Sequence, residues 1–437
     1  MKCKNCGTEI MPGDAVCPEC GSAEFVKEKK SGKSVVTLVM SIVAAIAALG
    51  CLAVLLLIAL GFDFKSILPR ENDILKKDVY AVSAEEAAEE ADEVVATIGD
   101  KELTNQQLQI YYRMQAMDLL NYYGDYISDV GLDLTKPFSE QTCKFDETLT
   151  WEQYLIKVSI ETWQNYQTIA LLGEEAKFIL DEEYEEALES LPAELLDQAK
   201  ESGFETVDEL LKDAVGPTCD QNAYVEYVRL AYFSTTYYET LNEKNIPTAE
   251  ELDAYYEKEK ATFEEQGITK DMGNISNVRH ILLMPKNGVA NEETGMMEYS
   301  EKEWEACFKE AEKILNEWKN GAATEESFAE LANTYSEDGG SNTTGCLYEG
   351  VAPGSNFVEN FLNWSIDMNR QVGDTEIVKT EYGYHIMYYV SGESYWEHVV
   401  QTQLIADRIT TMTTEAEEKW PMEVTYKKIA VTELKFD

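Results

Sequence analysis

Basic side chains are scarce in this sequence. Its 437 residues include 36 Lys and Arg against 82 Asp and Glu, which gives a formal net charge of -46. A field this acidic repels phosphate backbones and anionic headgroups, so nucleic-acid binding is disfavoured and cationic or extended polypeptide partners are favoured. Solubility alone is the simpler explanation of the charge. The length predicts two or three folded units.

Cysteines are too few and too unevenly placed for a disulfide-dense scaffold. Four of the nine lie at the N-terminus, and Cys51 lies within an apolar run. The remaining four are scattered over the rest of the chain: Cys143, Cys219, Cys307 and Cys346. They could form up to two bridges, but their spacing specifies no connectivity, so the disulfide state stays open.

The N-terminal cysteines form two Cys-x-x-Cys knuckles, each followed by a glycine: Cys3, Cys6, Cys17 and Cys20. Four thiolates suit tetrahedral zinc, and residues 1–25 resemble a zinc ribbon. A module this short has no core of its own, so we expect Zn²⁺ to supply its folding free energy. A closed site with four thiolate ligands argues against catalysis by the metal. The module is either a docking or regulatory head with a cytoplasmic partner, or a structural cap.

Charge is absent between Lys33 and Asp63. The uncharged residues 34–62 exceed the roughly 20 that cross a bilayer, and they predict one transmembrane helix. A cleaved signal peptide has a shorter apolar core and a short basic leader. The segment Ala48–Cys51 also resembles an imperfect lipoprotein processing box. Because uncharged residues continue from Leu52 to Phe62, whereas a mature lipoprotein begins polar, we favour an uncleaved anchor.

The flanking charges do not orient this anchor, because four basic residues lie close to it on either side. The thiolates of the zinc module need a reducing compartment to hold their metal. We therefore expect a single-pass protein of the cell membrane, with a cytoplasmic N-terminus and extracytoplasmic C-terminal domains.

A mostly helical region follows the anchor. Residues 63–92 are rich in Ala and Glu and predict a solvated acidic linker. The segments Val94–Ile98 and Lys101–Leu103 predict a short hairpin that leads into a helix beginning near Thr104. Capping boxes predict further helix starts at Thr150, Thr206 and Thr248. The many aromatic residues of region 93–275 indicate a core, although a partly exposed aromatic cleft would suit unfolded clients.

Residues 276–393 predict a compact α+β unit. A buried strand at Val278–Leu283 precedes a helix that runs from the cap Ser300 to about Trp318. The later elements are a helix at Phe328–Tyr335, a strand at Gly345–Leu347, a helix at Phe357–Trp364, and the stretch Gly373–Val390.

Four motifs occur in order along this unit: Arg279-His280-Ile281-Leu282; Phe328–Ala332 with Tyr335–Asp338; Gly354 with Phe357 and Phe361; and Thr380-x-x-Gly383-Tyr384-His385-Ile386. Together they resemble the parvulin-type peptidyl-prolyl isomerases. The resemblance implies that His280 and His385 form a central pair, that Thr380 hydrogen-bonds within it, and that Asp338 takes a position held by Cys or Asp. It also implies that the substrate is bound by Leu347, Phe357, Phe361 and Tyr382, and that catalysis needs no cofactor.

The pocket departs from the family pattern. Where the family has Gly-Asp-Leu-Gly and then an aromatic, this chain has Gly345-Cys346-Leu347-Tyr348-Glu349-Gly350, and Phe357 replaces the common methionine. The loop Asn287–Tyr299 resembles an insertion. The third histidine, His398, lies in a predicted amphipathic helix from about Trp396 to Glu418, and we interpret it as structural.

The flanking segments resemble the chaperone module of extracytoplasmic (PrsA/SurA-like) foldases, with Val424–Val431 as a returning strand. This implies a helical chaperone-like domain, 93–275 completed by 394–437, that carries an inserted parvulin-like domain. The expected function is isomerisation of X-Pro bonds in unfolded or partly folded exported polypeptides. Two alternatives stay open: a holdase chaperone with an inactive parvulin fold, and a membrane-spanning sensor with a zinc-ribbon head.

Overall fold

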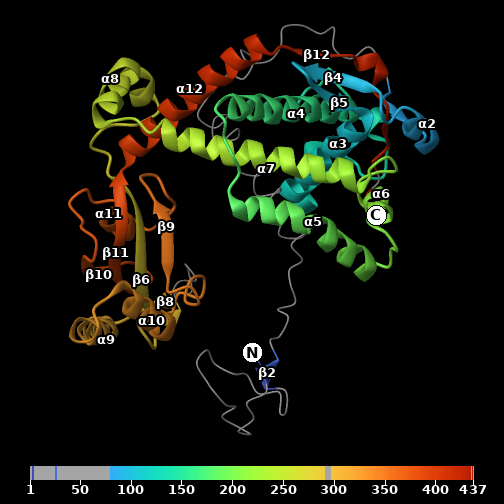
Figure 1. Ribbon diagram of the computed structural model, residues 1–437. Helices are drawn as coiled ribbons and strands as arrows, with labels where there is room; N and C mark the ends of the chain where they lie inside the picture. The colour runs from blue at the N-terminus through green and yellow to red at the C-terminus, as the bar shows by residue number, and fades with distance from the viewer. Residues whose placement is uncertain (1, 4–24, 27–78, 291–296, 435, 437) are drawn as a thin grey trace. The chain divides into compact units, whose positions relative to one another are not determined.

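The computed structural model describes residues 2–3, 25–26, 79–290, 297–434 and 436 (Figure 1). They fall into two compact units: the described residues up to Lys244 together with those from Thr410 onward, and Asn245–Ile409. Of the predicted zinc ribbon, only the antiparallel pair β1 (Lys2–Cys3) and β2 (Phe25–Val26) is described. Cys6, Cys17, Cys20 and the predicted anchor 34–62 lie outside the described residues. Within the described ranges, no helix is both long and apolar enough to cross a bilayer.

The predicted linker is folded from Val79 onward. Strand β3 (Ala81–Val82) pairs in parallel with β13 (Val431–Thr432), and helix α2 (Ala84–Glu89) follows. Tyr80 is fully buried, and the Glu152 carboxylate accepts the backbone N–H groups of Tyr80 and Ala81 at 2.8 and 2.9 Å. The prediction of a linker is therefore wrong for residues 79–92, because the buried Tyr80 anchors the segment to the first unit, although most side chains of α2 are exposed as predicted.

The predicted hairpin is confirmed as β4 (Val94–Ile98) and β5 (Lys101–Thr104). Strand β12 (Met422–Val424) adds to the other edge of β4, so the C-terminal segment completes a sheet that starts more than 300 residues earlier. The returning strand thus ends at Val424 rather than beginning there. The backbone then turns through η4 (Tyr426–Lys428) before β13 forms.

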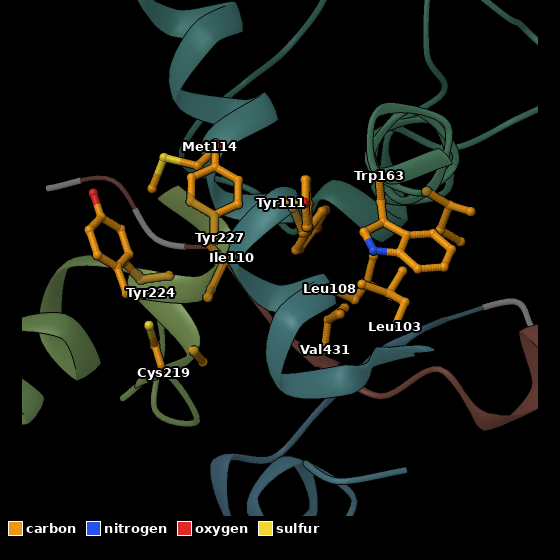
Figure 2. Packing of buried hydrophobic residues seen from close by; sticks show 14 of the residues in the cluster. Leu103, Leu108, Ile110, Tyr111, Met114, Trp163, Cys219, Tyr224, Tyr227 and Val431 are labelled. Carbon is orange, nitrogen blue, oxygen red and sulfur yellow. The ribbon is translucent and has the colours of Figure 1, made fainter. Parts of the chain in front are cut away.

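Between β5 and Lys244 the first unit has five helices: α3 (Asn105–Tyr123), α4 (Trp151–Glu175), α5 (Glu182–Glu201), α6 (Val207–Ala214) and α7 (Gln221–Lys244). The predicted capping boxes at Thr150 and Thr206 are both present. Short 3-10 turns, η2 (Gly124–Val130) and η3 (Phe138–Glu140), connect α3 to α4. Figure 2 shows how the core gathers around α3, where Tyr111 meets Tyr227 edge to face at 4.9 Å. The aromatic residues here are mostly core, as predicted.

The second unit is built on a four-stranded antiparallel sheet in the order β10-β11-β6-β9. The strands are β6 (Asn274–Leu283), β9 (Leu347–Val351), β10 (Thr375–Lys379) and β11 (Tyr384–Ser394). Helices α9 (Glu301–Asn320) and α10 (Glu325–Tyr335) bury an apolar cluster against one face, and α11 (Glu359–Ser365) covers the other. The predicted α+β order is confirmed.

The same unit includes a helical pair and a short hairpin. Helix α8 (Ala249–Glu265), with its predicted capping box at Thr248, packs Tyr256 and Phe263 against Trp396 near the start of α12 (Tyr395–Lys419). The inserted loop carries the short pair β7 (Val289–Ala290) and β8 (Met297–Glu298). Cys143, Cys219, Cys307 and Cys346 are buried free thiols, so none of these four forms a bridge.

Candidate functional site

Two adjacent strands place the histidine pair. In the antiparallel register of β6 and β11, His280 lies opposite Met387 and His385 lies opposite Leu282. The two histidines are therefore diagonal neighbours on the face that α11 covers. Their Nδ1 atoms lie 3.0 Å apart, and the residues are only 2% and 5% exposed.

The turn after α10 brings a carboxylate to this pair. Two hydrogen bonds hold this turn against the end of β6. Leu282 N–H donates to Ser336 Oγ at 3.1 Å, and Glu337 N–H donates to the Leu282 carbonyl at 2.8 Å. Asp338 Oδ2 consequently lies 3.1 Å from His280 Nε2. The same oxygen accepts a hydrogen bond from Ser341 Oγ at 2.5 Å.

A tight turn between β10 and β11 supplies the other end of the network. Thr380 Oγ1 lies 2.9 Å from His385 Nε2, and Tyr382 N–H donates to Thr380 Oγ1 at 3.2 Å. Thr380 N–H closes the turn on the Gly383 carbonyl at 2.9 Å. A Cβ on Gly383 would lie 2.0 Å from the Leu283 carbonyl oxygen, so only glycine fits there.

When both imidazoles are neutral, these contacts fix which atom donates and which accepts in each hydrogen bond of the network. The partners assign the protons: an ionised Asp338 only accepts, so His280 Nε2 carries its proton and His280 Nδ1 accepts from His385 Nδ1–H. His385 Nε2 is then an acceptor, and the Thr380 hydroxyl donates to it. Thr380, His385, His280 and Asp338 form an unbroken chain of donors and acceptors.

Burial and neighbouring groups shift the ionisation of this chain. Burial and the proximity of His280 lower the pKa of His385 from 6.5 to about 3, so its imidazole is neutral at physiological pH. The hydrogen bond from His280, followed by those from Ser341, Gly340 and Tyr348, holds the pKa of Asp338 well below its usual range despite partial burial. The site therefore combines a neutral histidine with a fixed negative charge.

Aromatic rings surround the histidines on this face. Phe361 meets both imidazoles edge to face, at 5.3 Å from His280 and 5.4 Å from His385 between ring centroids, and Phe357 stacks on Phe361 at 5.1 Å. Tyr348 stacks on His280 at 5.2 Å, and its hydroxyl donates to Asp338 Oδ2 at 2.9 Å. An apolar aromatic lining thus adjoins a charged hydrogen-bonding edge.

Two predicted substrate-binding residues lie apart from this cluster. The strand register pairs Leu347 with Arg279, which places Leu347 on the opposite sheet face from His280. Tyr382 is 56% exposed, and its backbone N–H donates to Thr380 Oγ1. The other predicted site residues are brought together: His280, Asp338, Phe357, Phe361, Thr380 and His385.

Sequence reasoning missed Tyr348 and Ser341. Tyr348, in β9, pairs with Val278 of β6. It therefore lies on the same sheet face as the histidines, one residue after the predicted Leu347. The sequence already departs from the family pattern at Tyr348. The strand register is what shows that Tyr348, rather than Leu347, faces the histidines. Ser341 lies three residues after Asp338 across a glycine turn, and no motif in the sequence marks it.

Part of this chain is similar to known proteins. Residues 265–390 match the family model of the PPIC-type PPIASE domain. The solved structure of PrsA from Bacillus subtilis shares 19% identity over 62% of this chain and 87% of that one, with a TM-score of 0.25. A Campylobacter jejuni structure described with the SurA-like chaperones PEB4 and Cj1289 shares 18% identity over 58% and 90% of the two chains, with a TM-score of 0.21. The peptidyl-prolyl isomerase ESS1 from Candida albicans shares 23% identity over 33% and 77%, with a TM-score of 0.20. No curated protein sequence matches the chain.

Proposed function

The chain contains a parvulin-type peptidyl-prolyl isomerase domain at residues 265–390, and we propose that it is a membrane-anchored foldase that isomerises X-Pro bonds of exported polypeptides outside the cell membrane. The observation that carries the proposed site is the network from Thr380 through His385 and His280 to Asp338, lying beside Phe357 and Phe361. The network supplies polar groups at one edge of an otherwise apolar surface.

The reaction needs no nucleophile. Rotation of an amide C–N bond must overcome about 18–20 kcal/mol, because resonance gives that bond partial double-bond character. The twisted amide has less charge separation than the planar one, so an apolar site stabilises the twisted state relative to the planar state. Phe357 and Phe361 supply such a surface for the prolyl ring. Lowering the barrier by roughly 5 kcal/mol would accelerate isomerisation nearly ten-thousandfold.

Asp338 has a role that follows from its charge. Resonance places partial negative charge on the amide oxygen of the planar substrate. A carboxylate whose pKa is held low stays ionised, and it repels this charge more in the planar state than in the twisted state. The neutral His385 holds His280 in place through their Nδ1 atoms, so we assign the histidines the role of positioning Asp338.

An X-Pro peptide isomerisation assay on the purified full chain tests this site. The variant that combines His280→Asn, His385→Asn and Asp338→Asn should lose most of the acceleration while retaining a cooperative thermal transition. His398→Asn is the matched control, because that histidine is partly exposed and contacts the Glu393 side chain, outside the buried pair. Unchanged activity in the triple variant would sink the assigned site.

The helical unit supports a second part of the proposal, the holding of unfolded clients. Tyr122 and Tyr126 are 65% and 71% exposed, and Tyr122 contacts Tyr123, which lies 6.2 Å from the partly exposed Phe145. Exposed aromatic surface of this kind suits extended apolar segments. Replacing Tyr122 and Tyr126 with Ser should weaken suppression of client aggregation without changing turnover of a short X-Pro peptide.

An inactive holdase is the second candidate, and Tyr348 favours it because its ring covers one face of His280. This candidate predicts that the purified chain suppresses aggregation of an unfolded client but gives no gain in the rate of X-Pro isomerisation. The two assays, run on the same preparation, separate the candidates.

We also propose the anchor and the zinc site on the basis of the sequence. The uncharged residues 34–62 would span the membrane once, with the N-terminus in the cytoplasm. The donor set Cys3, Cys6, Cys17 and Cys20 fits structural Zn²⁺, because four thiolates fill the tetrahedral coordination of that ion and leave no open position. Protease accessibility on intact cells tests the topology. Stoichiometric zinc in the purified chain, lost on joint Cys17→Ser and Cys20→Ser substitution, tests the site.

A further inference from the structure

Tyr348 occupies the surface beside His280. Its ring stacks on the imidazole with 5.2 Å between centroids and an interplanar angle of 28°. It also meets Phe357 edge to face at 5.2 Å and Phe361 at 6.1 Å. These are the aromatic rings to which we assign the prolyl ring of the substrate. The phenol ring therefore contacts the same aromatic surface that we assign to the substrate ring.

A polar contact holds this ring in place. The Tyr348 hydroxyl donates to Asp338 Oδ2 at 2.9 Å, and the same oxygen accepts from His280 and Ser341. Burial and then the Asp338 carboxylate raise the pKa of Tyr348, so the phenol keeps the proton that it donates. Hydrogen bonds to an ionised carboxylate are stronger than those between neutral groups, so this contact opposes movement of the ring.

The backbone leaves room for the ring to move. Tyr348 lies on β9, which is the edge strand of the sheet and pairs only with β6 among its four strands. The two residues that follow, Glu349 and Gly350, are exposed, and Tyr348 itself is half-buried. Rotation of the side chain toward solvent therefore breaks the Asp338 contact and the ring contacts without breaking a strand pairing.

We propose that Tyr348 competes with the substrate prolyl ring for the aromatic surface formed by Phe357, Phe361 and His280. This inference rests on the proposed isomerase function of the same site. In the resting enzyme the phenol covers the surface, and a substrate binds only when its own contacts offset the loss of the Tyr348 contacts. Tyr348 thus lowers the affinity for every X-Pro peptide by the same factor, which is set by the fraction of molecules in which the phenol has moved away.

Two substitutions separate the hydroxyl from the ring. Tyr348→Phe removes the hydrogen bond to Asp338, and Tyr348→Ala removes both the bond and the competing ring. In the full-length protein, we expect kcat/KM for a short X-Pro peptide to rise about threefold in Tyr348→Phe and about tenfold in Tyr348→Ala, chiefly through a lower KM. Fluorescence anisotropy with a labelled X-Pro peptide should show the same order of affinities.

Matched controls come from Tyr299, which packs against Trp304 in the same unit. Tyr299→Phe and Tyr299→Ala should leave peptide affinity and kcat/KM unchanged. A thermal transition recorded for each variant identifies any that fails to fold, and Tyr348→Phe keeps the test valid if Tyr348→Ala unfolds.

The outcomes distinguish this inference from the proposed function. If no protein accelerates isomerisation but the Tyr348 variants bind peptide more tightly, competition by Tyr348 stands and catalysis fails. If the wild type is active and the folded Tyr348 variants bind and turn over peptide equally well or worse, the ring is a wall of the site and the competition is overturned.

Discussion

The Nδ1 atoms of His280 and His385 face each other at 3.0 Å in the interior of the sheet face covered by α11. Two nitrogens at this distance share one proton, so the state of either imidazole sets the role of the other. Each ring uses its Nε2 atom for a different partner, Asp338 in one case and Thr380 in the other. A change at one end of the chain is therefore transmitted to the other end.

Loss of the Thr380 hydroxyl should disturb the far end of this chain. In Thr380→Val, His385 Nε2 loses its donor inside a buried site, which costs about 1–3 kcal/mol. Asp338 still sets the tautomers, but the His385 ring is then held at one end only, and we expect kcat/KM for X-Pro isomerisation to fall about tenfold. Thr380→Ser, which retains the hydroxyl, should keep most of the activity. Equal activities for the two variants would show that the hydroxyl does not position the histidines.

The stability of the second unit should depend on pH through His385. Its folded pKa, about 3, lies below the unfolded value near 6.5, so between these pH values the unfolded state binds more protons than the folded state. This stabilises the unfolded state as pH falls, by about 1.4 kcal/mol per pH unit in that window. The unfolding free energy of the wild type should therefore decrease on acidification below about pH 6.5.

Replacement of His385 isolates its contribution. In His385→Asn the titrating group is absent, so the excess stability of the wild type over this variant should be roughly 2 kcal/mol smaller at pH 4.5 than at pH 7. Urea unfolding followed by tryptophan fluorescence at both pH values measures the difference. His398→Asn, which removes a histidine outside the buried pair, is the control. A constant gap for His385→Asn would contradict the lowered pKa.

Gly383 should tolerate no side chain. A Cβ at this position would lie 2.0 Å from the Leu283 carbonyl oxygen and 3.1 Å from the Met284 Cα, both of which are backbone atoms that cannot rotate away. Gly383→Ala should therefore push the Thr380 turn off β6 and lower the thermal midpoint of the second unit by several degrees. Gly350→Ala is the control, because nothing lies within 4 Å of a Cβ there, although its positive φ carries its own smaller strain. Equal midpoints for the two variants would show that the turn can relax.

Much of the second unit could be predicted from the sequence. Its strands and helices carry strong periodic or capping signals, as in β6 and at Ser300, and the order of motifs indicated which histidines meet. Facing side chains were harder to predict, because one residue along a strand reverses the face. The sequence therefore suggested Leu347 as a pocket residue, whereas the register of β9 places Tyr348 there.

The predicted start of the first unit, at residue 93, was wrong for a different reason. Charge and alanine content in residues 84–90 predict exposure, and most of these side chains are exposed in α2. What orders the segment is a long-range contact, from the backbone of Tyr80 and Ala81 to Glu152, 72 and 71 residues away. No local pattern reports such a contact, so only the tertiary structure shows that the folded unit begins before residue 93.

The Glu152 carboxylate should control whether the segment from Tyr80 to α2 stays docked. It is 1% exposed and accepts two backbone N–H groups, so Glu152→Ala leaves buried donors without this acceptor and should destabilise the first unit by roughly 3 kcal/mol. Glu152→Gln keeps one acceptor oxygen and should cost about 1 kcal/mol. Limited proteolysis should cleave residues 79–92 faster in Glu152→Ala than in the wild type. Glu182→Ala, at an exposed position on α5, is the control. Cleavage at the control rate in Glu152→Ala would mean that β3 pairing with β13 and burial of Tyr80 suffice to hold the segment.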